Sequence, residues 1–208
     1  MYEYEKTIQV SDQINSPYTY LKRAFDLIFA LLLLVPAVLL VIIFGLAIRL
    51  ETPGNIFYKQ ERVGLMGKRI FVTKLRSMYS DAEEKSGPMW ATKSDSRVTK
   101  VGHFIRQTRI DELPQLFNVI KGEMSFIGPR PERPMFTEEF SKNVPGFEQR
   151  LTVLPGLSGL AQIRGGYEAT PAEKLADDME YIRHFGLSQD LKIVFGTLYV
   201  VVSGHGAR

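Results

Sequence analysis

The sequence predicts a mostly helical α/β protein, with a membrane-embedded N-terminal helix, a small domain outside the membrane and amphipathic helices at the interface. Three features predict this fold class: an uncharged run of membrane length, short strand-like segments punctuated by glycine and proline, and amphipathic helical segments. No composition shift marks a second core. We therefore expect a polar extension over residues 1–20, a membrane helix over 21–50 and one domain over 51–208.

The membrane helix is predicted from an uncharged apolar run between Leu27 and Ile48. About 20 apolar residues cross a hydrocarbon layer of about 30 Å, so this run is long enough to do so. The run is longer than the apolar region of a signal peptide, and no small-residue cleavage site follows it. A helix that is apolar on all sides needs a large protein to bury it, which disfavours the alternative of a core helix.

Pro36 and the flanking charges predict that this helix enters the membrane and returns to the same side. Pro36 lies near the middle of the run, where it removes a backbone hydrogen bond and kinks or breaks a helix. Lys22 and Arg23 precede the run and five basic residues follow it within 21 positions, so the positive-inside rule places both ends in the cytoplasm. An ordinary kinked span is the alternative that the sequence leaves open.

The remaining chain alternates between short strands and helices. Strands are expected in NIFYKQERVG and KRIFVTKLRSM, a polar loop from Ser80 to Ser96, and helices from Lys100 to Thr108 and after Pro114. A capping box begins an amphipathic helix at Thr170, with apolar positions at Leu175, Met179, Ile182 and Phe185 and with Asp178 among its polar positions. The later run LKIVFGTLYVVV is too short to span a bilayer and suits the interface or the core.

Composition excludes several classes of function. The chain has no cysteine, which excludes disulfides and thiolate metal sites. Its three histidines, His103, His184 and His205, lack zinc-ligand spacing. A net charge of +3 is too weak to indicate a nucleic-acid partner, and we expect none.

The densest polar cluster lies between Arg106 and Pro134 and contains an adjacent acid pair, Asp111 and Glu112. Neighbouring helical residues point about 100° apart, so the two carboxylates cannot share one role. One could attack or bind metal while the other orients a group or handles a proton. A charged turn that merely caps a helix is the alternative, and for an isolated acid pair it is the more common one.

Arginines surround the acid pair. Arg106 and Arg109 are three residues apart and are expected to share a helical face, from which two guanidinium groups could grip one anion. Arg130 lies between Pro129 and Pro131, which restrict its backbone. Each arginine taken alone would more often be a solvated surface residue.

Four motifs follow one another along the chain: Lys22, Arg23 and Asp26; FYKQERVG; RIDELPQLFNVIKGEMSFIGPRP; and LPGLSGLAQIRG. Together they resemble the bacterial sugar transferases, the monotopic phosphoglycosyl transferases that use a polyprenyl phosphate acceptor. The resemblance covers nearly everything from Tyr20 to Arg208.

The resemblance implies that Asp111 and Glu112 form the catalytic dyad. The aspartate would take a sugar 1-phosphate from a UDP-sugar, release UMP and pass the group to polyprenyl phosphate. This would be the initiating step of polysaccharide or glycoconjugate assembly, at the cytoplasmic face of the bacterial plasma membrane. It also implies Mg²⁺ with Asp111 as a ligand, and membrane lipid as a partner. The implied phosphate-binding residues are Arg106, Arg109, Arg130, Lys59 and Arg62.

Several points stay open at this level. Family members often have serine where this chain has Val35, which leaves the bend angle in doubt, and the polar extension has no assigned role. The sugar is not specified, because glucose, galactose or an N-acetylated hexose would all fit. A homodimer is one option for the oligomeric state. A membrane-anchored binding module and a phosphate-ester hydrolase are the competing functions, and the intact acid pair and the membrane helix respectively disfavour them.

Overall fold

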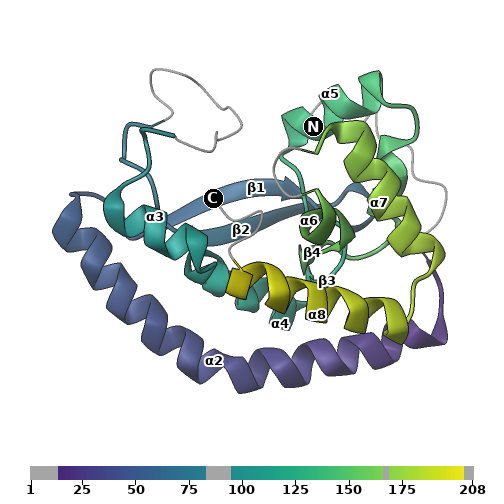
Figure 1. Cartoon of the computed structure of the whole chain (residues 1–208), viewed down its shortest axis with the longest axis horizontal. Helices are drawn as coiled ribbons and strands as arrows, with labels where there is room; N and C mark the ends of the chain where they lie inside the picture. The colour runs from purple at the N-terminus through teal and green to yellow at the C-terminus, as the bar shows by residue number, and fades with distance from the viewer. Residues whose placement is uncertain (1–13, 83–94, 166–168, 204–208) are drawn as a thin grey trace.

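The computed structural model describes residues 14–82, 95–165 and 169–203 and confirms a mostly helical fold with two small sheets. One long helix runs beneath a domain in which the other helices surround the strands (Figure 1). The elements, in chain order, are α2 (Pro17–Glu51), β1 (Phe57–Val63), η1 (Leu65–Gly67), β2 (Arg69–Leu75), α3 (Lys100–Gln107), η2 (Ile110–Gln115), α4 (Leu116–Lys121), β3 (Ser125–Ile127), α5 (Pro134–Asn143), η3 (Phe147–Thr152), β4 (Gly156–Ser158), α6 (Leu160–Arg164), α7 (Pro171–Arg183) and α8 (Leu187–Ser203).

Helix α2 begins at Ser16, whose hydroxyl accepts a hydrogen bond from the Tyr18 backbone, with Pro17 in the first turn. It continues through Pro36 without interruption and bends near its middle (Figure 1). Among the described residues it is the one helix long and apolar enough to cross a membrane, and only 11% of its most apolar stretch is buried. Such exposure is unlike that of a core helix in a soluble protein, so α2 is suited to contact lipid.

The N-terminal half of α2 is attached to the domain by its polar residues. Arg23 donates to the backbone carbonyls of Val119 and, at 2.7 Å, Ile120, near the end of α4. One carboxylate oxygen of Asp26 accepts from the Ser125 hydroxyl and from the next backbone N–H, both at 3.1 Å.

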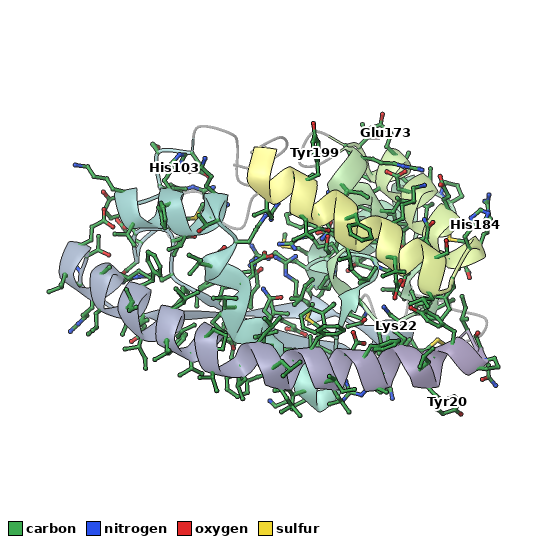
Figure 2. The ribbon with its side chains drawn as sticks, turned by 60° about the horizontal axis from the view of Figure 1, so that its bottom comes forward. Tyr20, Lys22, His103, Glu173, His184 and Tyr199 are labelled. Atoms are coloured by element: carbon green, nitrogen blue, oxygen red, sulfur yellow. The ribbon has the colours of Figure 1, made fainter. Side chains whose placement is uncertain are left out.

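Lys22 forms a buried ion pair with Asp190 at the beginning of α8, and it lies on the side of α2 that faces the domain, whereas Tyr20 points away from it (Figure 2). This pair and the contacts of Arg23 and Asp26 fix the membrane helix to three elements of the domain.

The C-terminal end of α2 is held by Arg76 and Glu51. Arg76 donates to the backbone carbonyl of Thr52 at 2.8 Å and to the hydroxyl of Thr52 at 2.9 Å. The Glu51 carboxylate accepts from the first two backbone N–H groups of α3, at 2.8 and 3.0 Å. A negative charge is stabilised at a helix N-terminus, so this contact also orients α3.

Strands β1 and β2 confirm the two predicted strands, and they pair as an antiparallel hairpin in which Tyr58 pairs with Lys74 and Gln60 with Val72. Ile70 and Val72 pack against Ala30 of α2 and Val119 of α4 in one core cluster. The other sheet is a short parallel pair of β3 and β4 that joins Ser125 to Gly156 and Ile127 to Ser158. The hairpin therefore rests on α2, and its side chains that line the cavity described below are those of Tyr58, Gln60, Arg62, Lys74 and Leu75.

The helix predictions have mixed outcomes. Helix α3 ends one residue before the predicted boundary, and the capping box of Thr170 and Glu173 is confirmed. Pro114 does not begin a helix but lies inside the 3₁₀ turn η2, and α4 begins two residues later. Asp178, expected on the polar side of α7, is 1% exposed because its carboxylate pairs with Arg150 at 2.7 Å.

The predicted polar loop and the N-terminal extension can be compared with the structure only in part. Most of the predicted Ser80–Ser96 loop, and residues 1–13 of the extension, lie outside the described residues. His103 and His184 lie at opposite ends of the molecule (Figure 2). This separation agrees with the absence of a shared metal-ligand spacing.

Substitution of Gly102 in α3 would test how closely this helix packs on the chain that follows β2. A Cβ at this position would lie 1.9 Å from the Ser77 carbonyl oxygen. We expect Gly102→Ala to lower the free energy of unfolding by about 1–3 kcal/mol, the usual cost of overpacking. At Gly186 the nearest atom would be 3.8 Å away, so Gly186→Ala should change it by only about 0.5 kcal/mol. Equal thermal unfolding midpoints for the two variants in detergent would contradict this packing.

Candidate active site

The acid pair lies on the 3₁₀ turn η2, between α3 and α4. Arg109 precedes it in the left-handed region, with φ 60° and ψ 13°. A non-glycine residue in this conformation stores strain, and such residues cluster at functional sites. The turn buries both acids, leaving Asp111 6% and Glu112 9% exposed.

Glu112 is fully engaged by two cations. Its carboxylate accepts from Lys74 at 2.6 Å and from both terminal nitrogens of Arg130, one of them at 3.3 Å. Burial alone would raise the pKa of Glu112, but the charges of Arg130 and Lys74 outweigh it and hold that pKa well below its usual range. Glu112 is therefore ionised at neutral pH and orients both cations.

Asp111 is in the opposite situation. Within the described residues its carboxylate has no hydrogen bond or ion pair, and it lines a polar cavity of about 330 Å³. Burial, followed by the negative charge of Glu112, raises the pKa of Asp111 to about 6, against the opposing effect of Lys74 and Arg106. The pair thus consists of the Glu112 carboxylate, which is bound by two cations, and the Asp111 carboxylate, which is free to react or to bind a cation.

The polar cavity is strongly basic. Its described lining includes two acids, Asp111 and Glu132, and ten cationic side chains. Guanidinium groups match phosphate oxygens in geometry and charge, so this cavity suits a ligand with several phosphate charges. The cations are Arg62, Lys74, Arg76, Arg97, Arg106, Arg109, Arg130, Arg133, Arg150 and Lys174.

The predicted arginines reach this cavity, although not all in the predicted way. Arg106 and Arg109 both line it, but they do not share a helical face, because α3 ends at Gln107 and Arg109 is left-handed. Arg130 extends from its proline-bounded turn to Glu112. Arg106 and Arg109 therefore approach the cavity from different backbone segments.

The hairpin separates the two predicted basic residues of β1. Arg62 faces the cavity, but it donates to the Pro131 carbonyl at 2.9 Å and lies 3.7 Å from Glu132. Burial is the main cause that lowers the pKa of Arg62 to about 10. Lys59 is exposed outside the cavity lining, with its ammonium 4.6 Å from the centre of the Phe71 ring. Successive side chains of a strand point to opposite faces of the sheet. Lys59 is three positions before Arg62, so the two side chains lie on opposite faces of β1.

Two important residues were not predicted. Lys74 lies in an apolar strand, opposite Tyr58. A lysine within an apolar strand is the sequence feature that could have identified it as a candidate site residue. Arg150 lines the cavity, donates to Asp178 at 2.8 Å and to the Arg130 carbonyl at 2.8 Å. Arg150 and Asp178 are 28 positions apart, so no local pattern indicates their pairing.

The described residues contain no group of three or more His, Cys, Asp or Glu side chains that could hold a metal ion. Two buried carboxylates line the cavity: Glu132, which is paired with Arg62 and Lys174, and Asp111, which has no ion pair within the described residues. Mg²⁺ is commonly held by one or two carboxylates together with substrate phosphates and water, so this donor set fits a metal that arrives with a phosphate ligand.

The chain matches the family model described as bacterial sugar transferase over residues 17–204. It is 60% identical over 134 residues to a protein from Bacillus subtilis named putative undecaprenyl-phosphate N-acetylgalactosaminyl 1-phosphate transferase, covering 64% of this chain and 74% of that protein.

Two longer relatives also match. The UDP-N-acetylgalactosamine-undecaprenyl-phosphate N-acetylgalactosaminephosphotransferase of Aeromonas hydrophila is 40% identical, with 96% of this chain and 48% of that protein covered. The UDP-glucose:undecaprenyl-phosphate glucose-1-phosphate transferase of Escherichia coli is 43% identical, with 86% and 39% covered. The chain thus spans half or less of the length of these two relatives.

The opposite environments of the two acids predict opposite effects of pH on stability. The native state holds a proton on Asp111 up to about pH 6, whereas an unfolded aspartate loses it near pH 4, so this group destabilises the fold as pH rises through that interval. We expect Asp111→Asn to be more stable than the wild type at pH 8, by up to about 3 kcal/mol, and the gain to shrink towards pH 4.

Glu112→Gln is the matched control with the opposite sign. The pKa of Glu112 is lowered in the folded protein, so its ionised carboxylate stabilises the fold at pH values above the pKa of a glutamate in the unfolded chain. This stabilisation is lost as the pH falls. Glu112→Gln should therefore be less stable than the wild type at pH 8. Thermal unfolding in detergent at several pH values measures both effects, and an Asp111→Asn variant with the wild-type pH dependence would contradict the environment described for Asp111.

Proposed function

This chain belongs to the bacterial sugar transferase family, and we propose that it transfers a sugar 1-phosphate from a UDP-sugar to undecaprenyl phosphate, a polyprenyl phosphate. The names of the relatives support both substrates. Those relatives differ in the sugar, N-acetylgalactosamine in one case and glucose in another, so the proposal is limited to a hexose 1-phosphate.

The observation that carries this proposal is the unpaired, buried carboxylate of Asp111 inside a basic cavity. In the proposed first step an Asp111 oxygen attacks the β-phosphorus of the UDP-sugar, and the bond from that phosphorus to the bridging oxygen breaks. UMP leaves with the bridging oxygen, and the sugar phosphate stays on Asp111 as an acyl phosphate. A covalent intermediate of this kind divides one difficult displacement into two.

In the proposed second step an oxygen of the carrier phosphate attacks the same phosphorus. The bond between phosphorus and Asp111 breaks, which returns the carboxylate and releases a polyprenyl diphosphosugar. The total charge of substrates and products is equal, so the net reaction needs no proton donor. Arg130, Arg106 and Lys74 would stabilise the phosphate charge in both steps.

Glu112 is proposed to act through its ion pairs. It holds Arg130 and Lys74 in one orientation at the edge of the cavity, so these donors need not reorganise when the phosphates bind. Such a role explains why two adjacent acids are needed although only one is free.

Magnesium is the proposed cofactor, with Asp111 and the substrate phosphates as its ligands. When bound, it would neutralise charge on the diphosphate as the leaving group departs. Loss of UMP release in excess chelator, with recovery after magnesium is added, tests this assignment, whereas full activity in chelator would contradict it.

Membrane attachment suits the acceptor, because a polyprenyl phosphate keeps its phosphate at the bilayer surface. We propose that α2 enters the cytoplasmic leaflet of the bacterial plasma membrane, bends at Pro36 and returns, with the domain on the cytoplasmic side. The exposed apolar surface of α2, the bend in Figure 1 and the basic residues at both flanks support this topology.

Asp111→Asn should abolish turnover, because an amide keeps the shape of the side chain but cannot attack phosphorus. We expect UMP release by the purified variant to fall at least a thousandfold, or about 4 kcal/mol in barrier height, at an unchanged pH. A variant that unfolds no earlier than the wild type and keeps more than about a tenth of the rate, a change under about 1.4 kcal/mol, would exclude Asp111 as the nucleophile.

The topology can be tested with single cysteines, because the chain has none. Asn15 and Asn55 are exposed, and they lie just beyond the N-terminal and C-terminal ends of α2 respectively. We expect Asn15→Cys and Asn55→Cys both to resist a membrane-impermeant maleimide in spheroplasts and both to react after lysis. Labelling of only one of them in spheroplasts would establish a crossing helix instead.

A further inference from the structure

The turn that carries Arg130 is held by its backbone carbonyl groups. Each of the residues 129–132 accepts one hydrogen bond there, at 2.8–3.0 Å. The donors come from three elements: Gly156 of β4, Arg150 of η3, and Arg62 and Val63 of β1. Pro129 and Pro131 have no backbone N–H, so the turn depends strongly on its carbonyl groups for attachment. The contact to the Arg130 carbonyl acts closest to the side chain that reaches the cavity.

Arg150 makes that contact, and its guanidinium is fixed on three sides. Nε donates to the Asp178 carboxylate at 2.8 Å, and Nη2 lies 2.7 Å from the same oxygen. Nη2 also donates to the Arg130 carbonyl at 2.8 Å. The central carbon of the guanidinium lies over the Phe147 ring, 4.9 Å from its centre. A planar guanidinium can make these contacts together, whereas a lysine ammonium, with one nitrogen, cannot.

The ion pair of Arg150 and Asp178 is buried, with the two residues 3% and 1% exposed. Asp178 belongs to α7, which packs against η3 and lies at the opposite end of the domain from α3 (Figure 1). A buried ion pair adds little net stability, because the cost of removing both charges from water offsets their attraction. Apolar side chains of similar size could hold η3 against α7 equally well. What this pair adds is direction, since it points one donor at one carbonyl.

A line of contacts therefore runs from α7 to the acid turn. It passes from Asp178 to Arg150, along the backbone and side chain of Arg130, and ends at Glu112. The Arg130 side chain is thus held at both ends, by Glu112 at its guanidinium and by Arg150 at its backbone. A misplacement of about 1 Å in a group that stabilises the transition state can cost about a hundredfold in rate. The position of the Arg130 backbone is therefore important for the rate.

We propose that Arg150, oriented by Asp178, is a positioning residue of the transfer reaction and acts by fixing the backbone of Arg130. The inference rests on the proposed function and adds to it a residue pair outside the acid turn. Arg150 also lines the polar cavity, so direct binding of a substrate phosphate is the alternative. Two of its three guanidinium nitrogens are already engaged by Asp178 and the Arg130 carbonyl, which favours positioning over binding.

A double-mutant cycle separates positioning from binding. Arg150→Lys keeps a positive charge for Asp178 but has no second nitrogen for the Arg130 carbonyl. Its effect on kcat and on the KM for UDP-sugar is measured in the wild type and in an Arg130→Gln background, from UMP release at saturating undecaprenyl phosphate. Burial raises the pKa of Asp178 to about 6, so assays at pH 8 keep its carboxylate ionised. Once the Arg130 guanidinium is absent, a residue that acts through it has little left to change.

We expect Arg150→Lys to lower kcat at least tenfold in the wild type and less than twofold in Arg130→Gln. The KM for UDP-sugar should change less than threefold, because the lost contact is not to the substrate. Asp178→Asn should follow the same pattern, since it removes the charge that orients Arg150. It provides a second cycle if Arg150→Lys does not fold, and thermal unfolding midpoints in detergent identify folded variants.

Arg164→Lys is the matched control. Arg164 also pairs with acids of α7, Asp177 and Glu180, but it is exposed and outside the lining of the polar cavity. Its kcat and KM should stay within twofold of wild type.

Three results would overturn the inference. An equal loss of kcat in both backgrounds would mean that Arg150 acts independently of Arg130. A rise of at least tenfold in the KM for UDP-sugar would assign Arg150 to substrate binding, and wild-type kcat in a folded Arg150→Lys variant would leave it a purely structural role. Failure of the proposed function is distinguishable from all three, because wild-type protein would then release no UMP from any UDP-sugar.

Discussion

The buried ion-pair cluster around Glu112 determines where the other functional groups lie. Its three members come from separate parts of the chain: Lys74 from β2, Glu112 from η2 and Arg130 from the turn after β3. Removing one partner of a buried pair typically costs about 3–5 kcal/mol, because an uncompensated charge remains. The hairpin, the acid turn and the proline-bounded turn are therefore held in one arrangement, and Asp111 is left facing the cavity.

The same turn connects the chemistry to the membrane. Helix α2 is fixed to the domain by Lys22, Arg23 and Asp26 at one half and by Arg76 and Glu51 at the other. A helix attached at both ends cannot tilt freely relative to the acid turn. The attachment of α2 thus fixes the position of Asp111 relative to this helix, which suits the proposed reaction between a water-soluble donor and a membrane acceptor.

Local patterns predicted much of this structure, and long-range pairing accounts for most of what they missed. The long apolar helix, the two strands of the hairpin and the capping box at Thr170 follow from periodicity and capping chemistry, which act within a few residues. Lys59 lies outside the lining of the polar cavity, and the motif could not indicate this because it gives residue types but not the face of a strand on which they lie. The burial of Asp178 depends on Arg150, 28 positions away, and no short pattern encodes that pair.

The acid pair shows the same division. The resemblance identified the pair and implied that the aspartate attacks phosphorus. The residues alone could not say which carboxylate pairs with cations and which is free, since Lys74 and Arg130 reach Glu112 from 38 and 18 positions away. The proposed reaction requires that the free carboxylate of Asp111 becomes covalently phosphorylated. This intermediate can be sought by intact-protein mass spectrometry after rapid acid quenching, with UDP-sugar and magnesium but no carrier. We expect an added sugar phosphate that maps to the peptide containing Asp111 and disappears when undecaprenyl phosphate is added. An unmodified chain that still releases UMP only in the presence of carrier, or an adduct on any other residue, would contradict it.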